Sequence, residues 1–191
     1  MRGVSPQSRL LVADIFGRDP KGGSALAIAR ALGWFATSDV AVVNISLAGP
    51  DNPLLARAIA AADRRGMLIV AAVGNDGAAA PPAYPASYPQ VIAVTGVDAR
   101  GRPLIEAGKA RHLDFAAPGA GLRAAKAAGG TGMVRGTSYA APFVVGRIAR
   151  LAAAERPARA RDRGAGRRSA RQGPVDRARH RLRRLCNALR S

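Results

Sequence analysis

Short apolar runs alternate with longer amphipathic segments along the first 155 residues, and this alternation constrains the fold more than any other feature. The runs are rich in Val, Ile, Leu and Ala, which is typical of strands that helices cover on both faces. Short links join each strand to the next helix, so the order predicts right-handed crossovers and a parallel sheet. Strands are predicted at residues 10–13, 40–45, 67–72, 91–95 and 113–115, and helices at residues 24–37, 53–65 and 138–153.

Turn chemistry separates these elements. Ser24 is placed to cap the first helix, and Gly66 is placed to end the second. Residues 129–132 read Gly-Gly-Thr-Gly and predict a flexible turn. The expected fold class is therefore α/β, with a parallel sheet and helices on both of its faces.

Composition excludes several classes of protein. Hydrophobic residues make up 48% of the 191 residues but aromatic residues only 4%, so small side chains must fill the core. Cys186 is the only cysteine, so no disulfide can form within the chain. No apolar run has the length of a membrane span, and residues 1–6 precede no apolar segment of a signal peptide. We therefore expect no membrane span and no export signal in the chain as written.

Net charge is concentrated at one end of the chain. The formal charge is +18, and residues 156–191 contain 13 arginines against Asp162 and Asp176. Such Arg-, Gly- and Pro-rich sequence predicts little independent order. The chain is thus divided into a domain at residues 1–155 and an Arg-rich tail at residues 156–191. Because the excess charge belongs mainly to the tail, a nucleic-acid partner is not expected for the domain.

Three polar segments stand where predicted strands end or a predicted helix begins. Residues 44–49 read Asn-Ile-Ser-Leu-Ala-Gly, residues 72–77 read Ala-Val-Gly-Asn-Asp-Gly, and residues 136–142 read Gly-Thr-Ser-Tyr-Ala-Ala-Pro. In parallel sheets, functional groups collect at such places. Each segment taken alone has an ordinary interpretation, since a serine often caps a helix and an asparagine between glycines often forms a turn.

Taken together and in this order, the three segments resemble the subtilisin-like (S8) serine peptidases over about residues 3–152. The resemblance implies a subtilisin-like fold, truncated at its N-terminus, and a serine endopeptidase acting on polypeptides. It implies that Ser138 is the catalytic nucleophile and that Asn75 supplies the oxyanion hole. The residues that it places along the substrate cleft are Ser46, Leu47, Ala48, Ala72, Val73 and Gly74.

The base that such a nucleophile requires is missing from these motifs. In the family, Asp and His motifs lie upstream of all the segments found here. Nothing marks His112, His180, Asp14 or Asp114 as a substitute, and all four have ordinary interpretations as structural or surface groups. We therefore expect negligible peptidase activity from this chain alone. No carboxylate cluster predicts a metal site, and no cofactor is expected.

Several alternatives stay open. The tail is a basic extension that binds nucleic acid or anionic surfaces, a disordered linker, or the product of out-of-frame translation of GC-rich DNA, and we favour the last or a degraded gene. The chain as a whole is a protease whose Asp and His are encoded upstream, or a non-catalytic pseudoenzyme or gene relic with a basic tail. Family members are mostly exported, but localisation and oligomeric state stay undetermined from the sequence.

Overall fold

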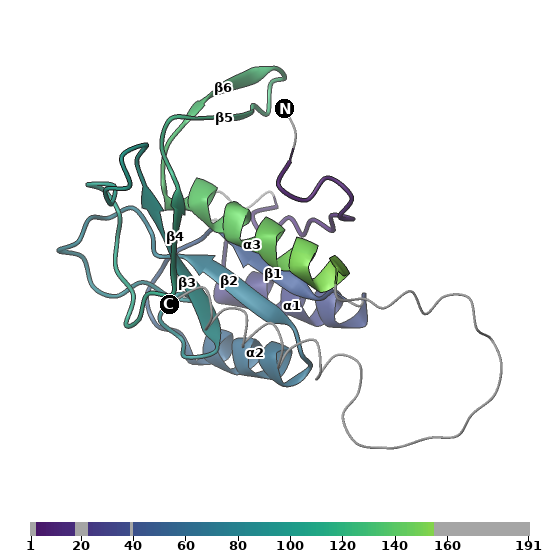
Figure 1. The fold of residues 1–191 in the computed structure, drawn as a ribbon. Coiled ribbons are helices and arrows are strands. Elements are labelled where there is room, and N and C mark those ends of the chain that lie inside the picture. The colour runs from purple at the N-terminus through teal and green to yellow at the C-terminus, as the bar shows by residue number, and fades with distance from the viewer. Residues whose placement is uncertain (1–2, 18–22, 39, 155–191) are drawn as a thin grey trace.

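A four-stranded parallel sheet organises the molecule. The computed structural model describes residues 3–17, 23–38 and 40–154. The strands are β1 (Val42–Ile45), β2 (Leu68–Ala72), β3 (Val91–Val97) and β4 (Phe115–Pro118), hydrogen-bonded in the order β1-β2-β3-β4 with every pair parallel (Figure 1). The predicted α/β class with a parallel sheet is confirmed.

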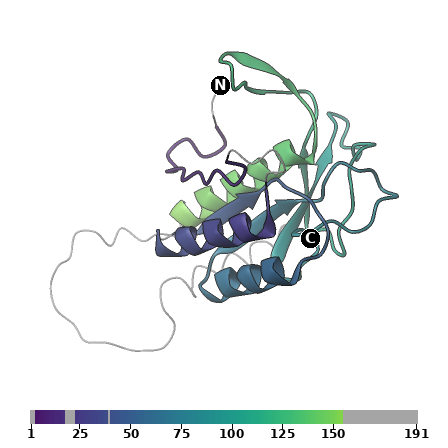
Figure 2. The same ribbon diagram turned by 180° about the vertical axis from the view of Figure 1, so that it is seen from behind.

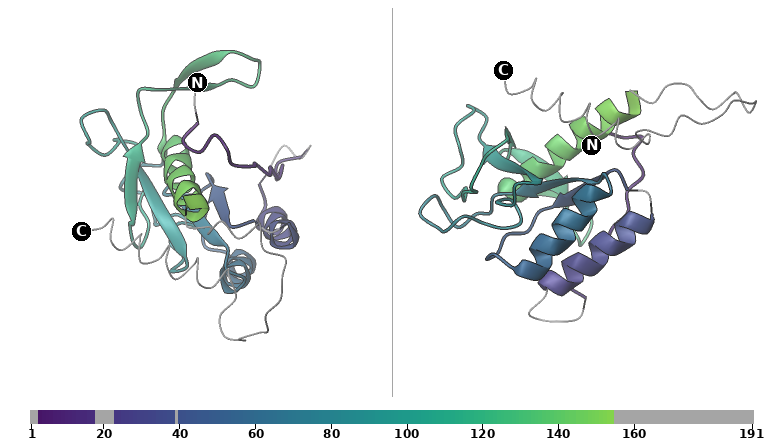
Figure 3. Two further views of the ribbon diagram at one scale, coloured as in Figure 1. Left: turned by 45° about the vertical axis from the view of Figure 1, so that its right-hand side comes forward. Right: turned by 90° about the horizontal axis from the view of Figure 1, so that it is seen from below.

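Helices cover both faces of this sheet. The helices are α1 (Ala25–Thr37), α2 (Pro53–Arg64) and α3 (Thr137–Ala154). Helices α1 and α2 lie side by side against one face, while α3 crosses the other face and contacts all four strands (Figures 2 and 3). The sheet is thus sandwiched, as the sequence predicts.

The central strand β2 shows how the core is divided. All five of its residues are buried, and alternate side chains point to opposite faces. Ile69 and Ala71 join the core beneath α1 and α2, whereas Val70 and Ala72 join the core beneath α3. Because Ala140 and Ala141 of α3 are fully buried there, small side chains allow this helix to approach the sheet closely.

Side-chain caps fix where the first two helices begin. The Ser24 hydroxyl accepts a hydrogen bond from the Ala27 N–H (3.1 Å). The Asn52 side chain accepts from the N–H groups of Leu54 and Leu55, and Pro53 occupies the first turn of α2. These contacts satisfy donors that a helix start leaves unpaired.

The strand predicted at residues 10–13 is wrong. These residues form no strand, and Leu10 and Val12 are 82% and 81% exposed. An apolar run becomes a strand only when another strand supplies hydrogen-bond partners, and none of the described residues does so here. The predicted strand at 113–115 begins instead at Phe115 and extends to Pro118.

An antiparallel hairpin lies outside the main sheet. Strand β5 (Leu122–Ala125) pairs with β6 (Thr131–Val134), and the chain then enters α3. The sequence predicts only a flexible turn in this region, and Gly129 and Gly130 do take positive φ angles of 90° and 70° between the strands. The hairpin leads directly to the segment that contains Ser138. The tail at residues 156–191 lies outside the described residues.

Candidate active site

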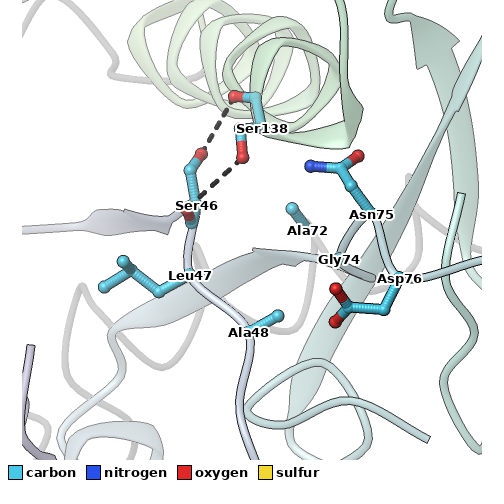
Figure 4. Close-up of a pocket in the computed structure, with 8 residues that line it drawn as sticks. All are labelled: Ser46, Leu47, Ala48, Ala72, Gly74, Asn75, Asp76 and Ser138. Atoms are coloured by element: carbon cyan, nitrogen blue, oxygen red, sulfur yellow. Dashed lines mark hydrogen bonds between the residues drawn. The ribbon is translucent and has the colours of Figure 1, made fainter. Parts of the chain in front are cut away.

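A pocket of about 270 Å³ lies where β1 and β2 end and α3 begins. Because parallel strands end at the same edge of a sheet, segments distant in sequence meet here. Figure 4 shows side chains from all three predicted polar segments around this pocket. The residues that line it are Ser46, Leu47, Ala48, Ala72, Gly74, Asn75, Asp76 and Ser138.

Ser138 is the second residue of α3 and is half-buried. Its hydroxyl makes one weak contact, donating to the Ser46 carbonyl oxygen over 3.4 Å. The first turn of a helix presents backbone N–H groups without intrahelical acceptors, together with the positive end of the helix dipole. Developing negative charge next to Ser138 would therefore be stabilised by the helix start.

The backbone carbonyl of Ser138 makes a second contact with Ser46, and Pro142 is the reason that this carbonyl is available. A proline has no N–H, so the carbonyl of Ser138, four residues earlier, lacks its helical donor. The Ser46 hydroxyl takes that place and donates to the Ser138 carbonyl oxygen over 3.0 Å (Figure 4). The Asn44 amide in turn donates to the Ser46 hydroxyl (2.9 Å). The end of β1 and the start of α3 are thus joined through Ser46.

The amide of Asn75 has a defined orientation. Its Oδ1 accepts hydrogen bonds from the Thr137 backbone N–H (2.9 Å) and from the Thr137 hydroxyl (3.1 Å). Since only an oxygen can accept from a backbone N–H, the Asn75 Nδ2 must be on the other side. Figure 4 shows this nitrogen directed toward Ser138. The arrangement leaves an amide donor facing the pocket.

Thr137, which orients the Asn75 amide, is a residue that the sequence analysis missed. It is fully buried, and its hydroxyl also lies 3.0 Å from the Gly74 carbonyl oxygen. Gly136, just before it, has a φ of 134°, and a β-carbon there would lie 3.3 Å from Asn75 Nδ2. The position of Thr137 between Gly136 and Ser138 was the available signal, because a helix start so close to a functional loop must be anchored.

Most of the predicted cleft residues line the pocket, but Val73 does not. The Val73 side chain is only 1% exposed and belongs to the core beneath α1 and α2. Asp76 lines the pocket without having been predicted, and its carboxylate lies beside Ala48, on the side away from Ser138 (Figure 4). Its position directly after Asn75 could have suggested it.

The pocket is narrow on the side opposite Ser138, at Gly74. Gly74 has a φ of 86°, and a β-carbon built on it would lie 3.0 Å from the Ala48 β-carbon and 3.7 Å from the Ala83 β-carbon. Two methyl groups therefore flank the Gly74 backbone. The space between residues 46–48 and 72–74 is therefore restricted at Gly74.

The pocket lining, as far as the structure describes the chain, includes no imidazole. His112 Nε2 lies 2.9 Å from the Val91 carbonyl oxygen and 3.4 Å from Asp114 Oδ2. That places His112 at the amino end of β3, whereas the pocket lies at the carboxyl ends of the strands. Asp14 accepts hydrogen bonds from the N–H groups of Phe16 and Gly17, which lower the pKa of its carboxyl group. His180 lies outside the described residues.

The described residues contain no group of three or more His, Cys, Asp or Glu side chains placed to hold a metal ion. Among the helices that the structure describes, none is long and apolar enough to cross a membrane.

Comparisons with known proteins point to one family. The family model described as the Subtilase family matches residues 1–175, which extends past the residue where composition places the domain boundary. Subtilisin BL of Lederbergia lenta is 33% identical over 148 residues, covering 77% of this chain and 54% of that protein. The major intracellular serine protease of Bacillus subtilis (strain 168) is 34% identical over 153 residues, covering 77% of this chain and 48% of that protein. The chain spans about half the length of these relatives.

Solved structures show the same likeness. The prenylagaramide maturation protease PagA superposes with a TM-score of 0.72 at 31% identity, covering 80% of this chain and 58% of that one. The self-cleaved protease domain of PatA superposes with a TM-score of 0.72 at 32% identity, covering 78% of this chain and 59% of that one.

Proposed function

Because the chain belongs to the subtilisin-like (S8) family of serine peptidases, we propose that it is the nucleophile-bearing part of a serine endopeptidase. The observation that carries the proposal is the meeting of Ser138 and Asn75 at one pocket, with the Asn75 amide held so that its nitrogen faces Ser138. The substrate class is polypeptide.

The reaction proposed is acyl transfer. Ser138 Oγ attacks the carbonyl carbon of a peptide bond, and the hydroxyl proton passes to a base. The oxyanion that forms accepts hydrogen bonds from the Ser138 backbone N–H and from Asn75 Nδ2. Collapse of this intermediate breaks the C–N bond, the amine leaves with a proton, and water then hydrolyses the Ser138 ester.

The base must come from outside the described residues. Within the described part of the chain, β1 pairs with β2 alone, so its other edge has no strand beside it. A strand added parallel to β1 would end beside Ser46, whose hydroxyl already contacts Ser138. A side chain at the end of such a strand would reach the serine. We therefore propose that this chain, which spans about half the length of its relatives, lacks peptidase activity by itself.

Chemical rescue tests this function. The full chain is incubated with a fluorogenic peptide, with and without added imidazole as an external base. We expect imidazole-dependent cleavage by the wild-type chain, a large loss in Asn75→Ala, and none in Ser138→Ala. Imidazole-dependent cleavage that is equal in wild type and Ser138→Ala would contradict the assignment of the nucleophile.

A non-catalytic role is the alternative. It predicts no cleavage in any of these mixtures, and it predicts that DNA binding by the full chain weakens with salt as its arginines release counterions. A chain ending at residue 155 that binds DNA as the full chain does would dismiss a binding role for the tail.

A further inference from the structure

A bidentate ion pair links two segments beside the pocket. Arg135 Nε donates to Glu106 Oε1 (2.6 Å), and a terminal nitrogen of Arg135 donates to Glu106 Oε2 (2.9 Å). Two parallel charge-assisted hydrogen bonds are stronger and more directional than a single contact. The hydrogen bond from Arg135 lowers the pKa of Glu106, so both groups are charged at neutral pH. The proposed acyl-transfer steps do not use this pair.

Glu106 belongs to the connection between β3 and β4, which packs against residues 73–77, here called the Asn75 loop. The Glu106 carbonyl accepts from the Gly77 N–H (3.0 Å), and the Gly108 N–H donates to the Gly74 carbonyl (2.8 Å). At Gly108 the approach is so close that a β-carbon would lie 2.4 Å from the Val73 carbonyl oxygen. This connection, between β3 and β4, therefore holds the Asn75 loop at both ends.

Arg135 belongs to a segment that holds the same loop from another side. It stands two residues before Thr137, whose N–H and hydroxyl both donate to Asn75 Oδ1. Gly136, between them, donates its N–H to the Gly119 carbonyl (2.8 Å). The Asn75 loop, the Glu106 connection and the Arg135 segment thus touch one another pairwise, and the ion pair joins the last two.

We propose that Glu106 and Arg135 are positioning residues that hold the Asn75 amide nitrogen toward Ser138. The ion pair keeps the turn at residues 135–137 against the Asn75 loop, so that the Thr137 N–H and hydroxyl continue to donate to Asn75 Oδ1 and hold the amide in one orientation. The inference rests on the proposed function for the role of Asn75, while the restraint itself is a property of the fold.

A second ion pair supplies a matched control. Asp98 and Arg102 are joined over 2.8 Å within the same connection, four residues apart. Breaking this pair removes a similar exposed contact without separating the connection from residue 135. Arg102→Gln should therefore leave the Asn75 amide unchanged.

The experiment uses the isotopically labelled full chain and needs no enzymatic activity. Glu106→Gln, Arg135→Gln, the charge reversal Glu106→Arg with Arg135→Glu, and Arg102→Gln are compared by NMR. The readouts are hydrogen exchange at the Thr137 and Gly77 backbone amides and the chemical shifts of the Asn75 side-chain amide. Both single Glu106 and Arg135 variants should exchange about two- to fivefold faster at these amides and shift the Asn75 signals. The charge reversal should restore both.

Unchanged exchange and unchanged Asn75 signals in both single variants would overturn the proposal. Equal changes in Arg102→Gln would overturn it as well, because the effect would then be a general loss of stability. Since no readout is turnover, a failure of the proposed peptidase function would leave these results unaffected. The two proposals therefore fail separately.

Discussion

At the scale of single residues, Thr137 links the start of α3 to the Asn75 side chain and to the Gly74 carbonyl. Its N–H and hydroxyl determine which way the Asn75 amide faces, and its hydroxyl also contacts the Gly74 carbonyl. Because Thr137 is fully buried, no water replaces a hydrogen bond that is removed there. The orientation of the proposed oxyanion donor thus depends on a side chain that would not itself touch a substrate.

Substitution Thr137→Val tests this dependence. The change keeps the shape of the side chain but removes its donor, so the Gly74 carbonyl loses a partner. Because the Gly74 carbonyl keeps the Gly108 N–H and Asn75 Oδ1 keeps the Thr137 N–H, we expect a loss of about 1 kcal/mol in the free energy of unfolding, measured with denaturant, and altered Asn75 side-chain amide signals. The control is Thr37→Val, which removes an exposed hydrogen bond to the Trp34 carbonyl at the end of α1. That variant should stay within about 0.5 kcal/mol of wild type, and an equal loss in both would contradict the special role of Thr137.

At the scale of elements, an irregular connection helps to position the pocket residues, as the helices and strands do. The connection between β3 and β4 has little regular structure, but its backbone contacts the Asn75 loop through Gly77 and Gly74. Such an approach is possible only where a glycine removes the β-carbon, as at Gly108. The position of the Asn75 loop therefore depends on the connection between β3 and β4.

Two glycine substitutions with opposite expected effects test this close approach. Gly108→Ala forces the connection away from the Val73 carbonyl and should destabilise the chain by about 1–3 kcal/mol. Gly33→Ala, on the exposed side of α1 with no atom within 4 Å, should stabilise it by about 0.5–1 kcal/mol. Denaturant unfolding measures both. An unchanged free energy of unfolding in Gly108→Ala would mean that the stability of the chain does not depend on the close approach of residue 108 to the Val73 carbonyl.

The Glu106–Arg135 pair also predicts a pH dependence. Its hydrogen bond lowers the pKa of Glu106 in the folded chain below that of the unfolded chain. The carboxylate therefore contributes stability above the ordinary glutamate pKa of about 4.3, and this contribution is lost as pH falls through the lower folded value. Wild type should be more stable than Glu106→Gln near neutral pH, and the difference in unfolding free energy should vanish in acid. A difference that is independent of pH would show that the charge of Glu106 has no part in it.

Sequence patterns predicted the elements whose stabilising contacts lie within a few residues of one another. They failed where the structure depends on contacts with residues far away in the sequence. Helix α1 could be predicted because its cap, Ser24, directly precedes it and its apolar stripe lies within it, so both signals are local in sequence. Residues 10–13 have the pattern of a strand but no partner strand among the described residues, so they stay exposed. Ser138 and Asn75 could be proposed from their motifs, whereas Glu106 and Arg135 could not, because they stand 29 positions apart with strand β4 and the β5–β6 hairpin between them.

At the scale of the whole molecule, β1 and β4 are the two edge strands of the sheet in the part of the chain that the structure describes, and the β1 edge is the one that ends beside the pocket. Strand β1 pairs with β2 alone, and Asn44 on β1 is exposed. Unpaired backbone groups along an edge favour pairing with another strand. The same edge ends next to Ser46 and Ser138, so the proposed need for a base and the unpaired edge concern one place in the molecule.

The proposed lack of a base at Ser138 is tested most sharply by the rate at which a fluorophosphonate, a reagent for activated serines, modifies Ser138 in the full 191-residue chain without added base. Mass spectrometry locates the modified residue, and Ser138→Ala is the control. We expect modification of the wild-type chain no faster than that of the Ser138→Ala variant, because a serine hydroxyl without a base is a poor nucleophile. Rapid modification at Ser138 would contradict it and would mean that this chain supplies its own base.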